Sequence, residues 1–174
     1  IAIVSYNHTF GNPTVINLRD SLYTTPVYPT AIFDGTDDVF ELDPNMFITT
    51  YTSHIMAAKA DTPSYNFDIT ATATATAGDI AITIVTADTI PAGQMVAYAT
   101  VCQDSIRGFT RDFNYVVKEM FSFPVELAYP DTLDTVITFS HALPVDKMRA
   151  VVFVQDMNTM EVMGSATSHF EEVE

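Results

Sequence analysis

The residue types that could carry chemistry are few in this 174-residue chain, and they lie far apart. A single cysteine, Cys102, excludes an intrachain disulfide, a Cys-x-x-Cys redox pair and a cysteine zinc site. Because Cys102 ends the apolar, strand-like segment 96–102, we expect a buried thiol that packs as a small hydrophobe. The four histidines are scattered without metal-binding spacing, so the sequence predicts no zinc centre.

Acidic side chains are densest around a turn signal near residue 35, at Asp34, Asp37 and Asp38. Carboxylate oxygens suit hard cations such as calcium, which makes these three aspartates a weak candidate cation site. Their spacing lacks the EF-hand register, and aspartates are common in turns because their side chains bond the local backbone. The sequence offers no phosphate-binding loop and no nucleophile paired with a base. It therefore predicts no catalytic residue, no cofactor and no resident metal.

Charge and hydrophobicity exclude several classes of protein. The chain has 22 acidic and 7 basic residues, a net charge of −15, so it lacks the clustered cations that bind nucleic acid or an anionic membrane surface. No run approaches the roughly 18 apolar residues of a membrane span. The 48% hydrophobic content predicts a folded core. The chain begins with Ile1 and shows no signal peptide, which predicts a processed mature form or a fragment.

The first 62 residues predict one compact α/β unit. Asn12 and Pro13 are suited to the N-cap and first position of a helix. Apolar spacing extends that helix to residue 22, and a second helix covers 44–60 behind another proline. The expected strands are 1–6, 27–33 and 39–42, with a turn at 34–37. The order is therefore β-α-β-β-α.

A different pattern begins after the proline-containing boundary at 61–64. Apolar and polar residues alternate from Tyr65 onward, which is typical of a strand with one buried face. Further strands are expected at 80–85, 94–103, 133–139, 149–155 and 160–166, while 113–121 fits either a strand or a short helix. Residues 63–174 therefore predict an antiparallel β-sandwich.

Threonines alternate with alanines in the segment 70–77, at Thr70, Thr72, Thr74 and Thr76. One interpretation is a strand whose threonines face water. The other is an exposed strand that offers a pairing edge for assembly, because the segment carries no charge to prevent pairing.

Segment 27–35 (VYPTAIFDG) resembles the thioredoxin-fold segment in which a cis-proline precedes a central strand. Three later segments resemble the tail of the outer membrane protein 28-related family of bacterial proteins, in which a thioredoxin-like domain precedes a β-sandwich. They are 113–120 (FNYVVKEM), 151–156 (VVFVQD) and 161–163 (EVM). The resemblance covers nearly the whole chain. It implies an α+β fold, in which a partial thioredoxin-like α/β unit precedes an immunoglobulin-like antiparallel β-sandwich. It also implies a cis peptide bond between Tyr28 and Pro29, and a secreted, extracellular or cell-surface location at the bacterial outer membrane.

The chain departs from that resemblance at the redox motif. In thioredoxin-like proteins a strand and a helix carrying Cys-x-x-Cys precede the part that corresponds to Ile1, and Cys102 lies in the other domain. No catalytic residue is therefore carried over. A missing central strand would leave backbone groups unpaired. Either the strands 1–6 and 27–33 close up directly, or another segment fills the position. Another copy of the chain could donate that segment, which would build filaments head to tail.

The expected function is that of a non-catalytic structural or interaction protein at the cell surface. Self-assembly into filaments by strand donation, and hence a homo-oligomer, is the expected partnership, with no nucleic-acid partner. Two alternatives stay open at this point. One is a fragment of a thioredoxin-like thiol–disulfide oxidoreductase that lacks its Cys-x-x-Cys segment. The other is a calcium- or carbohydrate-binding β-sandwich module.

Overall fold

The computed structural model describes residues 11–23, 31–33, 35–39, 43, 46–90, 93–108 and 112–174. Within these residues, two helices and two short strands precede the main sheet: α1 (Pro13–Tyr23), β1 (Ala31–Phe33), β2 (Asp37–Val39) and α2 (Phe47–Ala60). The predicted start of α1 is confirmed, because the Asn12 side-chain oxygen accepts the Thr14 amide at 3.0 Å. Helix α2 begins later than predicted, at Phe47, after a turn in which the Met46 amide bonds the Asp43 carbonyl.

Seven long strands then form one sheet in the order β8-β5-β10-β11-β3-β4-β9. They are β3 (Tyr65–Ala73), β4 (Ala77–Thr86), β5 (Met95–Gln103), β8 (Val116–Pro124), β9 (Thr132–Ser140), β10 (Met148–Asp156) and β11 (Val162–Glu172). Neighbours are antiparallel except β11 and β3, which are parallel and pair at residues 170–172 and 71–73. A small hairpin, β6 (Ile106–Arg107) with β7 (Asp112–Phe113), and a short 3-10 helix, η1 (Val145–Lys147), complete the described chain.

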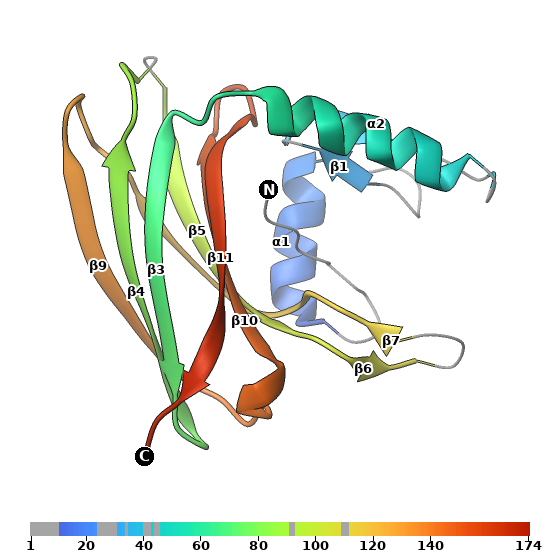
Figure 1. Ribbon diagram of the computed structural model, residues 1–174, viewed down its shortest axis with the longest axis vertical. Coiled ribbons are helices and arrows are strands. Elements are labelled where there is room, and N and C mark those ends of the chain that lie inside the picture. The colour runs from blue at the N-terminus through green and yellow to red at the C-terminus, as the bar shows by residue number, and fades with distance from the viewer. Residues whose placement is uncertain are drawn as a thin grey trace.

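The sheet curls so that its two halves face each other across one hydrophobic core (Figure 1). Alternation places Ile80, Ile82 and Ile84 of β4 inside, opposite residues of β5 and β10. Phe121 of β8 and Phe139 of β9 meet with ring centroids 5.9 Å apart, which joins the two ends of the sheet. The described residues are mostly β-sheet with two α-helices, so the predicted α+β class is confirmed.

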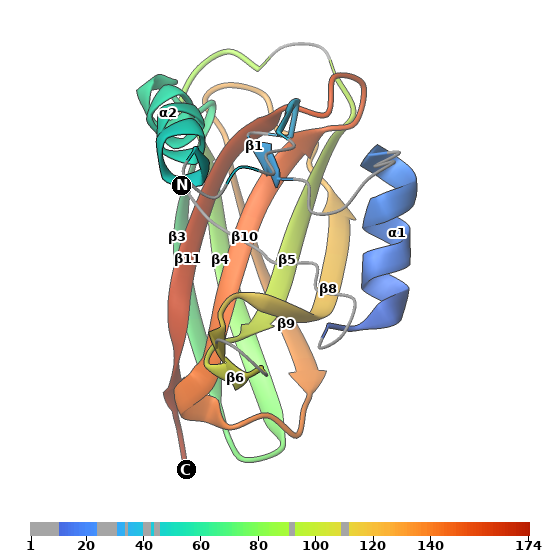
Figure 2. The same cartoon turned by 90° about the vertical axis from the view of Figure 1, so that its right-hand side faces the viewer.

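Strand β10 is buried on both faces. Its outer side meets α1 through single side chains, since Val151 packs with Val15 and Gln155 bonds Arg19. Figure 2 shows α1 beside β8 on this side of the sheet. Alternate residues of β10 enter the main core, and Val151, Phe153 and Gln155 on the other face meet residues of α1. Val15 of α1 packs there with Cys102, Val117 and Val151 in a second apolar cluster. The continuous hydrophobic sequence of β10 is thus explained by helix on one face and sheet on the other.

The threonine-rich segment is not a free edge, which corrects the second interpretation given above. Strand β3 lies inside the sheet, between β4 and β11. Thr70 is exposed and Thr72 is half-buried, as expected for threonines on the outer face. Thr74 and Thr76 lie beyond the strand in a tight turn, where the Thr74 hydroxyl oxygen accepts the Ala77 amide at 3.2 Å. The period-two pattern continues through this turn, so the sequence did not reveal it.

Candidate functional site

A buried arginine fixes α1 to the outer face of the sheet. Val15, Ile16 and Arg19 share one face of the helix by their spacing, and Arg19 is only 3% exposed. Its guanidinium carbon lies 4.9 Å from the Tyr98 ring centroid and 5.6 Å from that of Phe153. These two rings are cross-strand neighbours on β5 and β10 and stack on each other. The cation therefore stabilises the junction by electrostatic attraction to aromatic faces.

Gln155 of β10 completes this junction and is fully buried. Its side-chain oxygen accepts Arg19 Nη1 at 3.1 Å, and its Nε2 donates to the Tyr23 hydroxyl at 2.7 Å and to the Met160 carbonyl at 2.6 Å. Arg19 Nη2 also donates to the Tyr23 hydroxyl at 2.6 Å. The Gln155 amide, the two Arg19 Nη groups and the Tyr23 hydroxyl thereby have partners, and the cluster positions α1 rather than presenting a reactive atom.

The hairpin β1–β2 reaches the same cluster through its turn. Gly35 has a φ of +80°, a conformation that suits glycine, and a Cβ at this position would overlap the Met160 carbonyl oxygen. The turn thus lies against the connection between β10 and β11, next to the Gln155 amide. Both α1 and the hairpin are held by the same end of β10.

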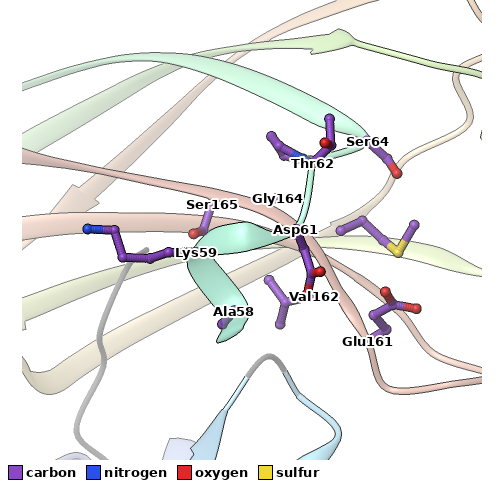
Figure 3. A pocket seen from close by; sticks show the side chains of 11 residues that line it. Ala58, Lys59, Asp61, Thr62, Ser64, Glu161, Val162, Gly164 and Ser165 are labelled. Atoms are coloured by element: carbon purple, nitrogen blue, oxygen red, sulfur yellow. The ribbon is translucent and has the colours of Figure 1, made fainter. Parts of the chain in front are cut away.

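A crevice of about 260 Å³ lies where α2 ends and the linker to β3 crosses the start of β11. Figure 3 shows Lys59 extending away from the carboxylates of Asp61 and Glu161. All three charged residues are exposed, so their charges stay solvated. A Cβ on Gly164 would meet the Tyr65 carbonyl oxygen, so this glycine allows β11 and β3 to approach. The crevice is thus the space left where the end of α2, the linker to β3 and the start of β11 pack together.

Cys102 has the properties of a packing residue. Its side chain is fully buried in the cluster under α1, as the sequence predicts. Burial raises the pKa of the Cys102 thiol to about 12, with a smaller opposing effect from the Thr100 hydroxyl. The thiol therefore stays protonated at neutral pH, and the thiolate needed for nucleophilic attack is not formed.

The two edges of the sheet differ in how they are covered. At the start of β8 the Asn12 amide donates to the Val117 carbonyl and the Asn12 side chain donates to the Lys118 carbonyl, each at 3.0 Å. A register shift in the pairing of β8 with β5, and Pro124 at the end of β8, further interrupt that edge. Strand β9 is hydrogen-bonded to β4 alone among the described strands, and Figure 1 shows it at the margin of the sheet.

The structure places the predicted site residues as follows. Tyr28, Pro29 and Asp34 lie outside the described residues, as do the side chains of Asp37 and Asp38, whose backbone belongs to β2. The predicted strand 1–6 also lies outside them. Among the residues that are described, no three His, Cys, Asp or Glu side chains are grouped to hold a metal ion. Likewise, no helix in the described ranges is long and apolar enough to cross a membrane.

Sequence reasoning predicted the α1 helix but not the junction beneath it. One signal was present, since Arg19 shares a helix face with Val15 and Ile16. Its partner, Gln155, is 136 residues away in the sequence and lies within an otherwise apolar strand. Nothing local in the sequence connects the two residues.

Comparisons with known proteins identify a shared fold. No family model and no curated protein matches the chain. HBP35 of Porphyromonas gingivalis superposes with a TM-score of 0.73 at 12% identity, over 91% of this chain and 58% of that one. A domain of the outer membrane lipoprotein Omp28 from the same organism gives a TM-score of 0.47 at 15% identity, covering 66% of this chain and 93% of that domain. The chain thus spans little more than half the length of HBP35, whose fold it shares over that part.

Proposed function

We propose that this chain is a non-catalytic cell-surface protein whose role is structural, and that it associates with further copies of itself. The observation that carries the proposal is the edge of the main sheet at β9, which pairs with β4 alone among the strands that the structure describes. An open strand edge presents a row of unpaired backbone donors and acceptors, which is a template for pairing with another chain. The opposite edge at β8 is partly covered by the chain itself.

The cell-surface part of the proposal is supported by composition and by resemblance. The chain is acidic and contains only 7 basic residues among 174. Its sequence resembles the tail of the outer membrane protein 28-related family in segments 113–120, 151–156 and 161–163. The fold shared with HBP35 is compatible with that resemblance but does not by itself specify a location.

The non-catalytic part is supported by the surroundings of three buried or half-buried groups among the described residues that could in principle react. The Arg19 guanidinium donates to Gln155 and Tyr23 within the junction. The Cys102 thiol is kept protonated by burial. Arg149 and Asp104 form an ion pair at 2.8 Å, with the Arg149 guanidinium over the Tyr115 ring. In each case the polar group is engaged in holding elements together.

Antibody labelling of intact source cells tests the location. We expect antibodies raised against the purified chain to label cells before permeabilisation. A cytoplasmic protein probed in the same samples controls for leakage. Labelling that requires lysis would contradict a surface location.

A further inference from the structure

Hydrogen bonds at both ends of β9 identify the backbone groups that point away from the sheet. The Thr86 amide donates to the Asp131 carbonyl at 3.1 Å, and the His141 amide donates to the Thr76 carbonyl at 2.9 Å. In an antiparallel ladder every second residue bonds the same neighbour, so the odd-numbered residues from 131 to 141 bond β4. The even-numbered residues 132–140 therefore direct their N–H and C=O groups outward.

The side chains of these even-numbered residues are also exposed, on the outer face of the sheet. They are Thr132, Asp134, Val136, Thr138 and Ser140. Val136 is the central residue of the nine in β9 and is 62% exposed. Asp134 is the single charged residue of the strand. The edge thus has an apolar centre, one carboxylate and three hydroxyl groups.

The sequence of β9 is complementary to itself in one antiparallel register. If two copies pair about a two-fold axis at Val136, all nine residues overlap, and Asp134 faces Thr138 of the second copy. A centre at Asp134 would oppose two carboxylates, which is destabilising. A two-fold axis at Thr135 would place the Asp134 carboxylate of one copy opposite the apolar Val136 of the other. An axis at any residue other than Val136 also leaves fewer than nine residues of each strand paired.

A pair of this kind already exists inside the chain. Thr83 of β4 lies directly opposite Asp134, and its hydroxyl donates to the Asp134 carboxylate at 2.6 Å. The carboxylate has a second oxygen, which can accept a hydroxyl from the other side. Thr138 of the second copy would supply that donor, twice in a symmetric dimer.

We infer that two copies of this chain form a two-fold symmetric dimer in which their β9 strands pair antiparallel about Val136. This inference rests on the self-association proposed above and names its surface. The pairing joins two seven-stranded sheets into one continuous sheet. An isologous contact of this kind closes on itself, so the product is a dimer and not the filament that strand donation would build.

Sedimentation equilibrium of matched variants tests the surface. A Val136→Lys variant places two ammonium groups together at the axis, so we expect loss of the dimer between about 1 μM and about 1 mM. The substitution lowers the net negative charge of each copy, so general repulsion cannot explain the loss. Thr70→Lys is the matched control, because it puts the same charge on the exposed face of the interior strand β3 and should leave the dimer intact.

Disulfide cross-linking tests the register. Val136→Cys brings two thiols together at the axis, so we expect rapid oxidation to a covalent dimer. Thr132→Cys places its two thiols about 26 Å apart in this register and should not link to itself. Thr132→Cys mixed with Ser140→Cys should link. The native Cys102 is fully buried and does not compete.

The outcomes separate this inference from the function on which it rests. Self-association that survives Val136→Lys, or Thr132→Cys linking to itself as fast as Val136→Cys, overturns the β9 dimer and leaves self-association standing. A wild-type chain that stays a 19.2 kDa monomer throughout overturns the inference and the proposed self-association together. Circular dichroism of each variant confirms that it is folded before the comparison is made.

Discussion

At the scale of single residues, Arg19 and Gln155 determine whether the N-terminal part stays attached to the sheet. Truncation by Arg19→Ala leaves the buried Gln155 oxygen without this donor, so we expect a loss of about 2–4 kcal/mol in the free energy of unfolding. Leu18→Ala on the same helix is the control. Leu18 is 51% exposed, and its truncation should change stability by less than about 0.5 kcal/mol. Urea titrations that give equal losses for the two variants would contradict this role of Arg19.

The Cys102 thiol gives a prediction about pH. Its pKa is about 12 in the folded chain against 9.0 ordinarily, because burial disfavours the thiolate. Below pH 9 the thiol is protonated in both states, and its contribution to stability is fully present. Above pH 9 the unfolded chain releases this proton and the folded chain retains it, so stability falls until about pH 12.

Relative to Cys102→Ala, the wild-type chain should therefore lose about 2 kcal/mol more between about pH 8 and about pH 10.5. Urea unfolding of both proteins at the two pH values provides the measurement. Parallel pH profiles for the two proteins would show that the thiol is not held protonated by the fold.

At the scale of elements, the β3–β4 turn depends on a threonine rather than on glycine or asparagine. The Thr74 hydroxyl oxygen accepts the Ala77 amide, and the Thr74 amide donates to the Ala77 carbonyl. Thr74→Ala should destabilise the protein by about 1 kcal/mol through the lost side-chain bond. Thr70→Ala, on the exposed face of β3, is the control and should have little effect. Similar thermal midpoints for the two variants would contradict the role given to the turn.

The strands and helices were largely predictable because their patterns are local. The cap at Asn12 and the apolar alternation of β4 follow from neighbours in sequence. The turn at Thr74 was missed because the alternation of threonine and alanine continues through it. Gly78 and Asp79 are residue types typical of turns, yet they lie inside β4. The interior position of β3 was also missed, since it depends on β11, about a hundred residues later. Register and strand order arise from tertiary packing, which a local pattern does not encode.

At the scale of the whole molecule, the net negative charge of each copy opposes dimerisation, while the backbone groups at the β9 edge of the sheet favour it. Each copy carries a net charge of −15, and two copies repel each other at long range. Salt screens this repulsion, with a Debye length of about 10 Å at 0.1 M and about 3 Å at 1 M. We therefore expect the dimer to strengthen as sodium chloride is raised. A dimer that weakens with salt would indicate an interface made of ion pairs instead.

Sedimentation equilibrium of the wild-type chain beside Val136→Lys is the most direct test of the central claim. The account predicts a reversible monomer–dimer equilibrium for the wild-type chain, with no larger species, and a monomer of 19.2 kDa for the variant. A wild-type chain that is monomeric at every concentration, or a variant that dimerises equally well, would contradict it.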